Sequence, residues 1–197
     1  MVRMATYGLP LPTRYCLVAG SGEGYSCLNA FDAALLAAGI GNMNLLKVSS
    51  ILPAGARQVS EISLPPGSLV PTAYAALTSD IPGEVISAAV AVGHGSHAEY
   101  GVIMELSGRR PAREIEAEIR RMVEDAFAKR GRKLLEVQVK SIEHVVRRTG
   151  CAFAAVALLY DEVLYDRHHT PTCSVGLRSD QDQAAGDEQG AAELNQV

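Results

Sequence analysis

Residues 151–159, with the sequence CAFAAVALL, form an uninterrupted apolar run in a chain of 197 residues. A short run without polar alternation is typical of a strand at the centre of a sheet. The apolar runs in the chain all fall well short of the roughly 20 residues that a membrane-spanning helix needs. We therefore expect a protein without membrane association, in which the rest of the chain supplies further strands around this one.

Further segments rich in β-favouring residues are separated by turn signals, and we expect a strand in each of them. These segments are residues 15–19, 40–53, 69–77, 84–92, 102–106 and 135–139.

Two segments are typical of helices. One runs from Asn29, which can cap it, through an alanine-rich stretch to Gly39, with Asp32 in its first turn. The other begins at Pro111 and ends before Gly131, and its apolar residues fall on one stripe. The stripe contains Ile115, Ile119, Met122, Val123, Ala126 and Phe127. Several strands with only two substantial helices predict an α+β fold.

Charge separates the C-terminal segment from the rest of the chain. After Arg178 there are five acidic residues and no lysine or arginine, so this segment accounts for all of the negative net charge of -4. The remainder is nearly neutral and offers no basic surface for nucleic acid. We expect a folded domain over residues 1–165 and a flexible acidic tail over residues 166–197.

Composition indicates an ordinary globular protein, because 48% of the residues are hydrophobic and 20% are charged. The N-terminal residues do not resemble a signal peptide. The four cysteines, at positions 16, 27, 151 and 173, lack CxxC spacing. We expect a cytoplasmic protein with reduced thiols.

Two patterns that sometimes indicate ligand sites are weak here. Residues 20–24 read GSGEG, without the GxGxxG or GK[ST] spacing of a phosphate loop, so we interpret them as a glycine-rich turn before a helix. His94 and His97 share a glycine-rich loop, while His168, His169 and Cys173 lie in the expected tail. Neither group has the further ligands that a metal site requires, and we expect no metal.

Glu105 ends an apolar strand segment and by alternation shares a face with Ile103. Burial there would raise its pKa and keep it protonated, as a general acid requires. Considered alone, however, the pattern fits a water-facing glutamate on an edge strand better. Asp32 in isolation is an ordinary helix residue favoured by the helix dipole, and Ser49-Ser50 in isolation is a turn at the end of a strand.

A longer run changes the interpretation of these residues. Residues 29–53, NAFDAALLAAGIGNMNLLKVSSILP, strongly resemble the self-cleavage region of the pyruvoyl-dependent arginine decarboxylase family. The resemblance extends over roughly residues 15–160 and includes LVAG (17–20), LVPTAY (69–74), TSDIPGE (78–84), IME (103–105) and GCAFAA (150–155). Ala33 stands where the family often has glycine. Residues 51–54 read ILPA where the family has IMPP, so Leu52 replaces a methionine. These departures would adjust a pocket and leave the chemistry intact.

The resemblance implies that the chain cuts itself between Ser49 and Ser50, giving a β chain of residues 1–49 and an α chain of residues 50–197. The Ser50 hydroxyl attacks the Ser49 carbonyl, and residue 50 becomes a covalently bound N-terminal pyruvoyl group. This group replaces pyridoxal phosphate as the electron sink when L-arginine loses carbon dioxide to give agmatine.

The resemblance also implies roles for further residues. Glu105 protonates the carbon that has lost carbon dioxide. Asn44 and the new carboxyl terminus at Ser49 line the pyruvoyl site. Asp32 and Leu35 surround the substrate side chain, where a carboxylate can pair with both arms of a guanidinium.

The implied assembly is a homotrimer of cleaved αβ protomers, each a four-layer αββα sandwich, with sites between neighbours. Two alternatives remain: an uncleaved, non-catalytic homologue that binds small molecules as an oligomer, and a decarboxylase of another basic amino acid. The presence of both Ser50 and Glu105 disfavours the first.

Overall fold

The computed structural model describes residues 10–161, so the expected tail over residues 166–197 lies outside the described residues. The described part has two helices and nine strands and confirms the α+β class. The elements are β1 (Arg14–Glu23), α1 (Cys27–Ala37), β2 (Asn44–Lys47), β3 (Ile51–Leu52), β4 (Arg57–Gln58), β5 (Leu69–Ser79), β6 (Val85–His94), β7 (Gly101–Gly108), α2 (Ala112–Lys129), β8 (Glu136–Val145) and β9 (Gly150–Leu159).

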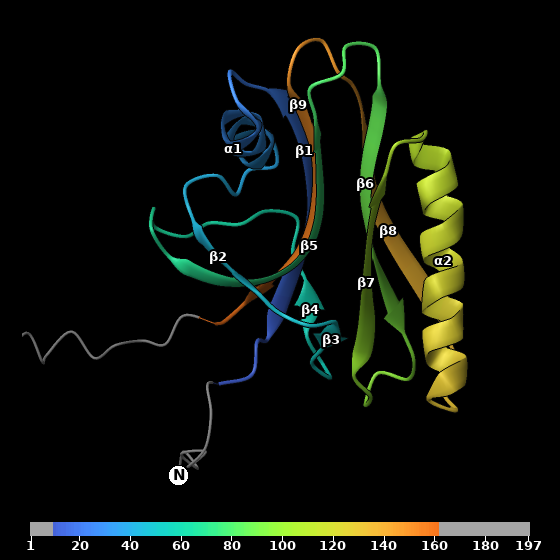
Figure 1. Ribbon diagram of the computed structural model, residues 1–197. Coiled ribbons are helices and arrows are strands. Elements are labelled where there is room, and N and C mark those ends of the chain that lie inside the picture. Colours follow the sequence, from blue (N-terminus) through green and yellow to red (C-terminus); the bar gives the residue numbers. More distant parts are fainter. Residues whose placement is uncertain (1–9, 162–197) are drawn as a thin grey trace, which may run out of the picture. The chain divides into compact units, whose positions relative to one another are not determined.

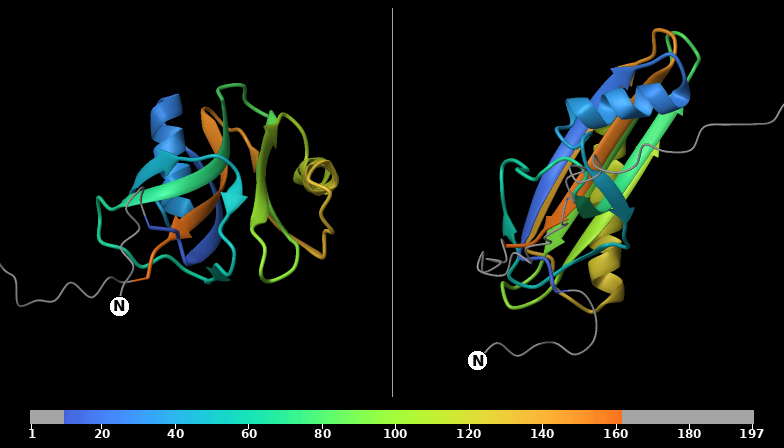
Figure 2. Two further views of the ribbon diagram at one scale, coloured as in Figure 1. Left: turned by 90° about the horizontal axis from the view of Figure 1, so that it is seen from below. Right: turned by 90° about the vertical axis from the view of Figure 1, so that its left-hand side faces the viewer.

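The strands form two sheets, one with the order β2-β5-β9-β1-β4 and the other with the order β3-β7-β6-β8. Strand β9 lies at the centre of the five-stranded sheet, and all of its residues are buried, as the apolar run predicts. Helix α1 packs on β1 and β9, while α2 packs on β6, β7 and β8 (Figure 1). The two helices therefore lie on opposite outer faces of the pair of sheets (Figure 2).

Alternation along β9 explains why it must be apolar throughout. Ala152, Ala154 and Val156 pack in the core between the two sheets, whereas Phe153 and Ala155 pack in the core beneath α1. The strand thus contributes to two cores and has no face toward water. A third core lies beneath α2 and includes the predicted stripe residues Ile115, Ile119, Val123, Ala126 and Phe127.

The glycines at the end of β1 allow α1 to pack closely against the strand. Strand β1 continues through Glu23, so the expected turn over residues 20–24 is wrong for Gly20 and Gly22. A Cβ atom added at Gly20 would lie 2.5 Å from the Ala34 carbonyl oxygen, and one at Gly24 would lie 2.2 Å from the Ala30 nitrogen. Glycines two apart share one face of the strand, so the helix contacts bare backbone there.

Helix α1 begins three residues earlier than its sequence pattern suggested, because its cap is Ser26 and not Asn29. Ser26, in an extended conformation, caps it by accepting a hydrogen bond from the Asn29 backbone N–H at 3.3 Å. Asp32 consequently falls beyond the first turn. The helix ends as expected, because Gly39 adopts a φ of 75°. Neither helix among residues 10–161 has the length and apolarity that crossing a membrane requires.

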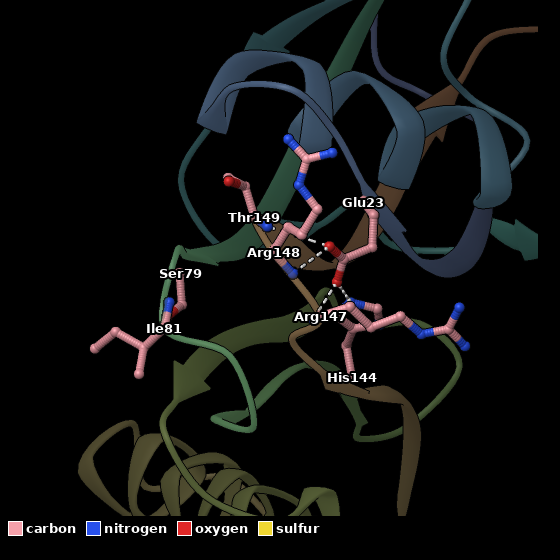
Figure 3. Close-up of polar contacts among 7 residues, drawn as sticks. All are labelled: Glu23, Ser79, Ile81, His144, Arg147, Arg148 and Thr149. Atoms are coloured by element: carbon pink, nitrogen blue, oxygen red, sulfur yellow. Dashed lines mark hydrogen bonds and ion pairs between the residues drawn. The ribbon is translucent and has the colours of Figure 1, made fainter.

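The carboxylate of Glu23 joins the end of β1 to the turn between β8 and β9 (Figure 3). It accepts hydrogen bonds from the backbone N–H groups of Arg147, Arg148 and Thr149 at 2.8, 3.0 and 3.1 Å, and it lies 2.7 Å from His144 Nε2. Burial acts to raise the pKa of Glu23, but these hydrogen bonds outweigh it and lower the pKa to about 2. We call these five residues the Glu23 cluster.

The Glu23 cluster predicts a pH-dependent contribution to stability. Because the pKa of Glu23 is lower in the folded chain than its ordinary value of 4.5, the carboxylate stabilises the fold above about pH 4.5, and this stabilisation is lost as the pH falls toward 2. Hydrogen bonds to a charged group contribute about 1.5–3 kcal/mol, so Glu23→Gln should lower Tm at pH 7 by roughly 3–12 °C. Thermal unfolding followed by circular dichroism should show this difference shrinking between pH 4.5 and pH 2. A difference that stays constant over that range would show that the charge is not responsible.

Candidate active site

The Ser49–Ser50 peptide bond lies where the chain passes from one sheet to the other. Strand β2 pairs with β5 in parallel, with Lys47 opposite Thr72, in the five-stranded sheet. Strand β3 pairs with β7 antiparallel in the four-stranded sheet. The single strand expected over residues 40–53 is therefore wrong, because residues 48–50 form a crossing between the sheets.

Backbone hydrogen bonds fix the chain on both sides of this crossing. The Val48 N–H donates to the Thr72 carbonyl of β5 at 3.2 Å, and the Ile103 N–H of β7 donates to the Ser50 carbonyl at 2.8 Å. The Ile51 N–H donates to the Ser49 carbonyl at 3.2 Å, which is the hydrogen bond of a γ-turn. This last bond polarises the carbonyl of the Ser49–Ser50 peptide.

Glu105 reaches the crossing from β7. Ile103, which lies two residues earlier on the same face of β7, packs in the core between the sheets. Val102 and Met104, on the opposite face, pack toward α2. Glu105 therefore points toward the space between the sheets, where it is half-buried, so the water-facing position that the pattern alone favoured is wrong.

The Ser50 hydroxyl donates to Glu105 Oε2 at 3.4 Å. This distance is long for a hydrogen bond, as is common for catalytic contacts before the reacting geometry forms. Burial raises the pKa of Glu105, while the Ser50 hydroxyl and the positive charge of Lys47 offset part of that effect. Glu105 thus holds its proton to a higher pH than an ordinary glutamate and lies beside a hydroxyl.

The other residues expected at the site lie elsewhere on the chain. Asp32, which is exposed, and Leu35, which is buried, line a cavity of about 430 Å³ beside α1. Neither Ser50 nor Glu105 lines that cavity. Asn44 begins β2, and its side-chain amide donates to the Gly67 carbonyl at 2.9 Å. The structure therefore brings together Ser49, Ser50 and Glu105, and it places Asp32 and Leu35 in a separate hollow.

Three features of the site were not found from the sequence. The partners of the crossing, Thr72 and Ile103, have no local signal because only sheet pairing brings them there. Lys47, which acts on the pKa of Glu105, also lies 4.6 Å from the ring centre of Tyr74. An apolar hollow of about 500 Å³ borders the crossing, and distant segments supply its lining. The lining residues are Leu11, Pro12, Val48, Ile51, Pro53, Ala54, Pro71, Tyr100, Leu158 and Tyr160.

The histidines considered as metal ligands have other surroundings. His94 Nε2 lies 3.3 Å from the Tyr15 hydroxyl, which itself donates to Gln138 at 3.0 Å. Between residues 10 and 161, no three histidine, cysteine or acidic side chains gather in a way that could hold a metal ion. His168, His169 and Cys173 lie outside the described residues.

Comparison with known proteins identifies relatives over most of this chain. The chain is 49% identical over 151 residues to a pyruvoyl-dependent arginine decarboxylase of Methanocaldococcus jannaschii, covering 76% of this chain and 92% of the relative. Proteins of the same name from Methanococcus aeolicus and Pyrococcus abyssi are 48% and 42% identical, covering 76% of this chain and 91% and 96% of their own lengths.

A solved structure of a pyruvoyl-dependent histidine decarboxylase is similar over 51% of this chain and 54% of its own, with 12% identity. Its TM-score of 0.44 is too low to bear on the substrate or the assembly. The family model described as pyruvoyl-dependent arginine decarboxylase matches residues 14–163, which include the crossing, Glu105 and α1. With this match over well more than half of its length, the chain belongs to the pyruvoyl-dependent arginine decarboxylase family.

Proposed function

We propose that this chain cleaves its own Ser49–Ser50 bond and then, as a carbon–carbon lyase, converts L-arginine to agmatine and carbon dioxide. The observation that carries the proposal is the crossing between the sheets. There a polarised peptide carbonyl, an adjacent serine hydroxyl and a half-buried carboxyl group meet, in a chain that belongs to this family.

The residues present fit a pyruvoyl group formed from Ser50. The Ser50 carbonyl is held by β7 through Ile103, and Glu105 lies beside the Ser50 side chain. After a cut at the crossing, β2 would remain paired with β5 and β3 with β7, so neither new end would have to leave its sheet. When formed, the group supplies a ketone that accepts the electron pair left as carbon dioxide departs.

The groups that meet at the crossing support the cut that we propose. The Ser50 hydroxyl oxygen attacks the Ser49 carbonyl carbon, and the hydroxyl proton is released for uptake by the peptide nitrogen in the next step. The Ile51 N–H donates to the oxygen on which negative charge develops. The peptide C–N bond then breaks and the nitrogen takes up a proton, which leaves an ester. Elimination from that ester removes the α-proton of residue 50 and breaks its Cβ–O bond, which releases residues 1–49 with a carboxyl terminus and leaves dehydroalanine at position 50. The dehydroalanine tautomerises to an imine, and water hydrolyses the imine to the pyruvoyl ketone and ammonia.

In turnover, Glu105 delivers a proton to the carbon that has lost carbon dioxide. A general acid has to be protonated at the working pH, and burial raises the pKa of Glu105 in that direction. Asn44 and the carboxyl terminus at Ser49 complete the surroundings of the reacting carbon. Asp32 pairs with the guanidinium of the substrate, and Leu35 packs against its methylene groups.

The assembly that we propose is a homotrimer of cleaved αβ protomers, each a four-layer αββα sandwich, with the site between neighbours. Its support is that Asp32 and Leu35 line one cavity of the protomer while Ser50 and Glu105 meet at another place. If the cavity of one protomer faced the crossing of its neighbour across an interface, the Asp32 carboxylate would lie opposite the group formed from Ser50. We also propose a cytoplasmic location, which the free thiols of Cys16, Cys27 and Cys151 support.

Asp32→Asn is expected to weaken the use of arginine far more than it weakens self-cleavage. The variant loses a charge-assisted pair with the guanidinium, which costs about ten- to a thousandfold in kcat/KM, whereas cleavage is local to the crossing. The measurement is steady-state agmatine formation, normalised to the pyruvoyl content of each preparation.

Asp125→Asn is the matched control, because Asp125 is an exposed aspartate of α2 that pairs with Lys129 at 2.7 Å. It should leave kcat/KM unchanged. A cleaved Asp32→Asn protein with the kcat/KM of the wild type would show that Asp32 does not recognise the substrate. Comparing arginine with lysine and ornithine in the wild type tests the alternative of another basic amino acid.

A further inference from the structure

The corner between β1 and α1 is short, and it precedes the helix that carries Asp32 and Leu35. Strand β1 ends at Glu23 and α1 begins at Cys27, so three residues connect them. Ser26, the last of the three, caps the helix. The position of α1 therefore depends on where this corner is held.

The Glu23 cluster holds the corner from a distant part of the sequence. Oε1 of Glu23 accepts from the Arg147 N–H and contacts His144, while Oε2 accepts from the N–H groups of Arg148 and Thr149. The next residue, Gly24, donates its own N–H to the Thr149 carbonyl at 2.9 Å. Successive backbone N–H groups of this kind form an anion-binding concavity, and a carboxylate of the same chain fills it.

The backbone is closely packed at two glycines beside the cluster, Gly24 and Gly150. A Cβ atom at Gly150 would lie 2.6 Å from the His144 ring and 3.0 Å from Glu23 Oε1. One at Gly24 would lie 2.2 Å from the Ala30 nitrogen of α1 itself. At Gly24 backbone touches backbone, whereas at Gly150 the side chains of His144 and Glu23 pack against the backbone. Gly24 directly follows Glu23 in the chain, so a displacement of Glu23 passes through Gly24 to the helix.

We propose that Glu23 is a positioning residue for substrate binding: by fixing the corner it sets the place of Asp32 and Leu35 without touching arginine. This inference rests on the proposed function, in which α1 contacts the substrate side chain. The crossing is fixed by Thr72 of β5 and Ile103 of β7, neither of which belongs to the Glu23 cluster. Loss of Glu23 should therefore affect the binding of arginine and spare the cleavage of the chain.

The test is Glu23→Gln, which keeps the size of the side chain and removes its charge. We expect complete cleavage, a kcat per pyruvoyl group within about twofold of the wild type, and a KM for arginine raised about tenfold, measured well below Tm. His144→Gln removes one partner and leaves the three backbone hydrogen bonds, so its rise in KM should be smaller. Glu118→Gln, which breaks the ion pair with Arg110 beside α2, is the matched control and should leave KM unchanged.

Hydrogen exchange adds a readout that does not depend on the substrate. Amides in the first turn of α1 should exchange faster in Glu23→Gln than in the wild type or in Glu118→Gln. If Glu23→Gln does not fold, the KM and exchange of His144→Gln decide in its place, and wild-type values there overturn the inference.

The failures of the inference and of the proposed function are distinguishable. An unchanged KM in Glu23→Gln, together with a raised KM in Asp32→Asn, would overturn the positioning role and leave the function intact. Unchanged KM values in both variants would show that arginine does not contact α1, which contradicts the proposed site and the inference with it. A fall in kcat and in cleavage without a rise in KM would mean that Glu23 acts on the crossing, and this too overturns the inference.

Discussion

Ser50→Ala is expected to remain a single uncleaved chain and to lack decarboxylase activity. The variant has no hydroxyl to attack the Ser49 carbonyl, although the backbone bonds that fix the crossing are all retained. Loss of the residue that becomes the reacting group removes the whole catalysed rate, an effect larger than that of any supporting residue. Gel electrophoresis and intact mass measure the cleavage, and agmatine formation measures the activity.

Ser49→Ala is the matched control for this experiment. The Ser49 carbonyl is attacked, but its side chain is not consumed, so the variant should still cleave even if more slowly. Appearance of two chains in Ser50→Ala would show that another residue starts the cut.

Glu105→Gln, once cleaved, is expected to bind arginine and to stall at protonation. Glutamine nearly preserves the volume of the side chain but has no proton to transfer, and loss of a general acid costs about 10²–10⁴-fold in rate. The measurement is turnover per pyruvoyl group, with separate assays for carbon dioxide and agmatine. Because burial raises the pKa of Glu105, wild-type kcat should fall as the pH rises through that pKa, and this limb should be missing from the residual activity of the variant.

Glu118→Gln again serves as the control, since Glu118 belongs to α2 and pairs with Arg110. Wild-type turnover in a Glu105→Gln preparation whose pyruvoyl content is complete would remove Glu105 from the mechanism.

The parts of the fold that follow from local periodicity could be predicted from the sequence. The apolar run of β9 predicted a central strand, and the stripe of α2 predicted the face that packs on β6 and β7. Alternation in β7 placed Glu105 on the same face as Ile103, which packs in the core between the sheets, although the pattern alone favoured a water-facing glutamate. In each case the prediction depends only on the pattern of residues within one helix or strand.

The parts that depend on contacts between elements could not be predicted in this way. The β-favouring residues 40–53 do not reveal that β2 and β3 pair in different sheets, because strand propensity does not indicate which strand will be the partner. The Glu23 cluster was equally hidden, since three of its donors are backbone groups 124 to 126 residues away along the chain. The roles of Ser50 and Asp32 came from resemblance to a family, because each residue alone fits a turn or an ordinary helix position.

The intact mass of the purified wild-type protein tests the central claim most directly. We expect two chains, residues 1–49 and 50–197, of about 5 and 16 kDa in proportion to their lengths within the 20.9 kDa whole. The larger chain should resist Edman sequencing, because a pyruvoyl terminus has no amine. A single intact chain of 20.9 kDa that decarboxylates arginine without an added cofactor would contradict the account.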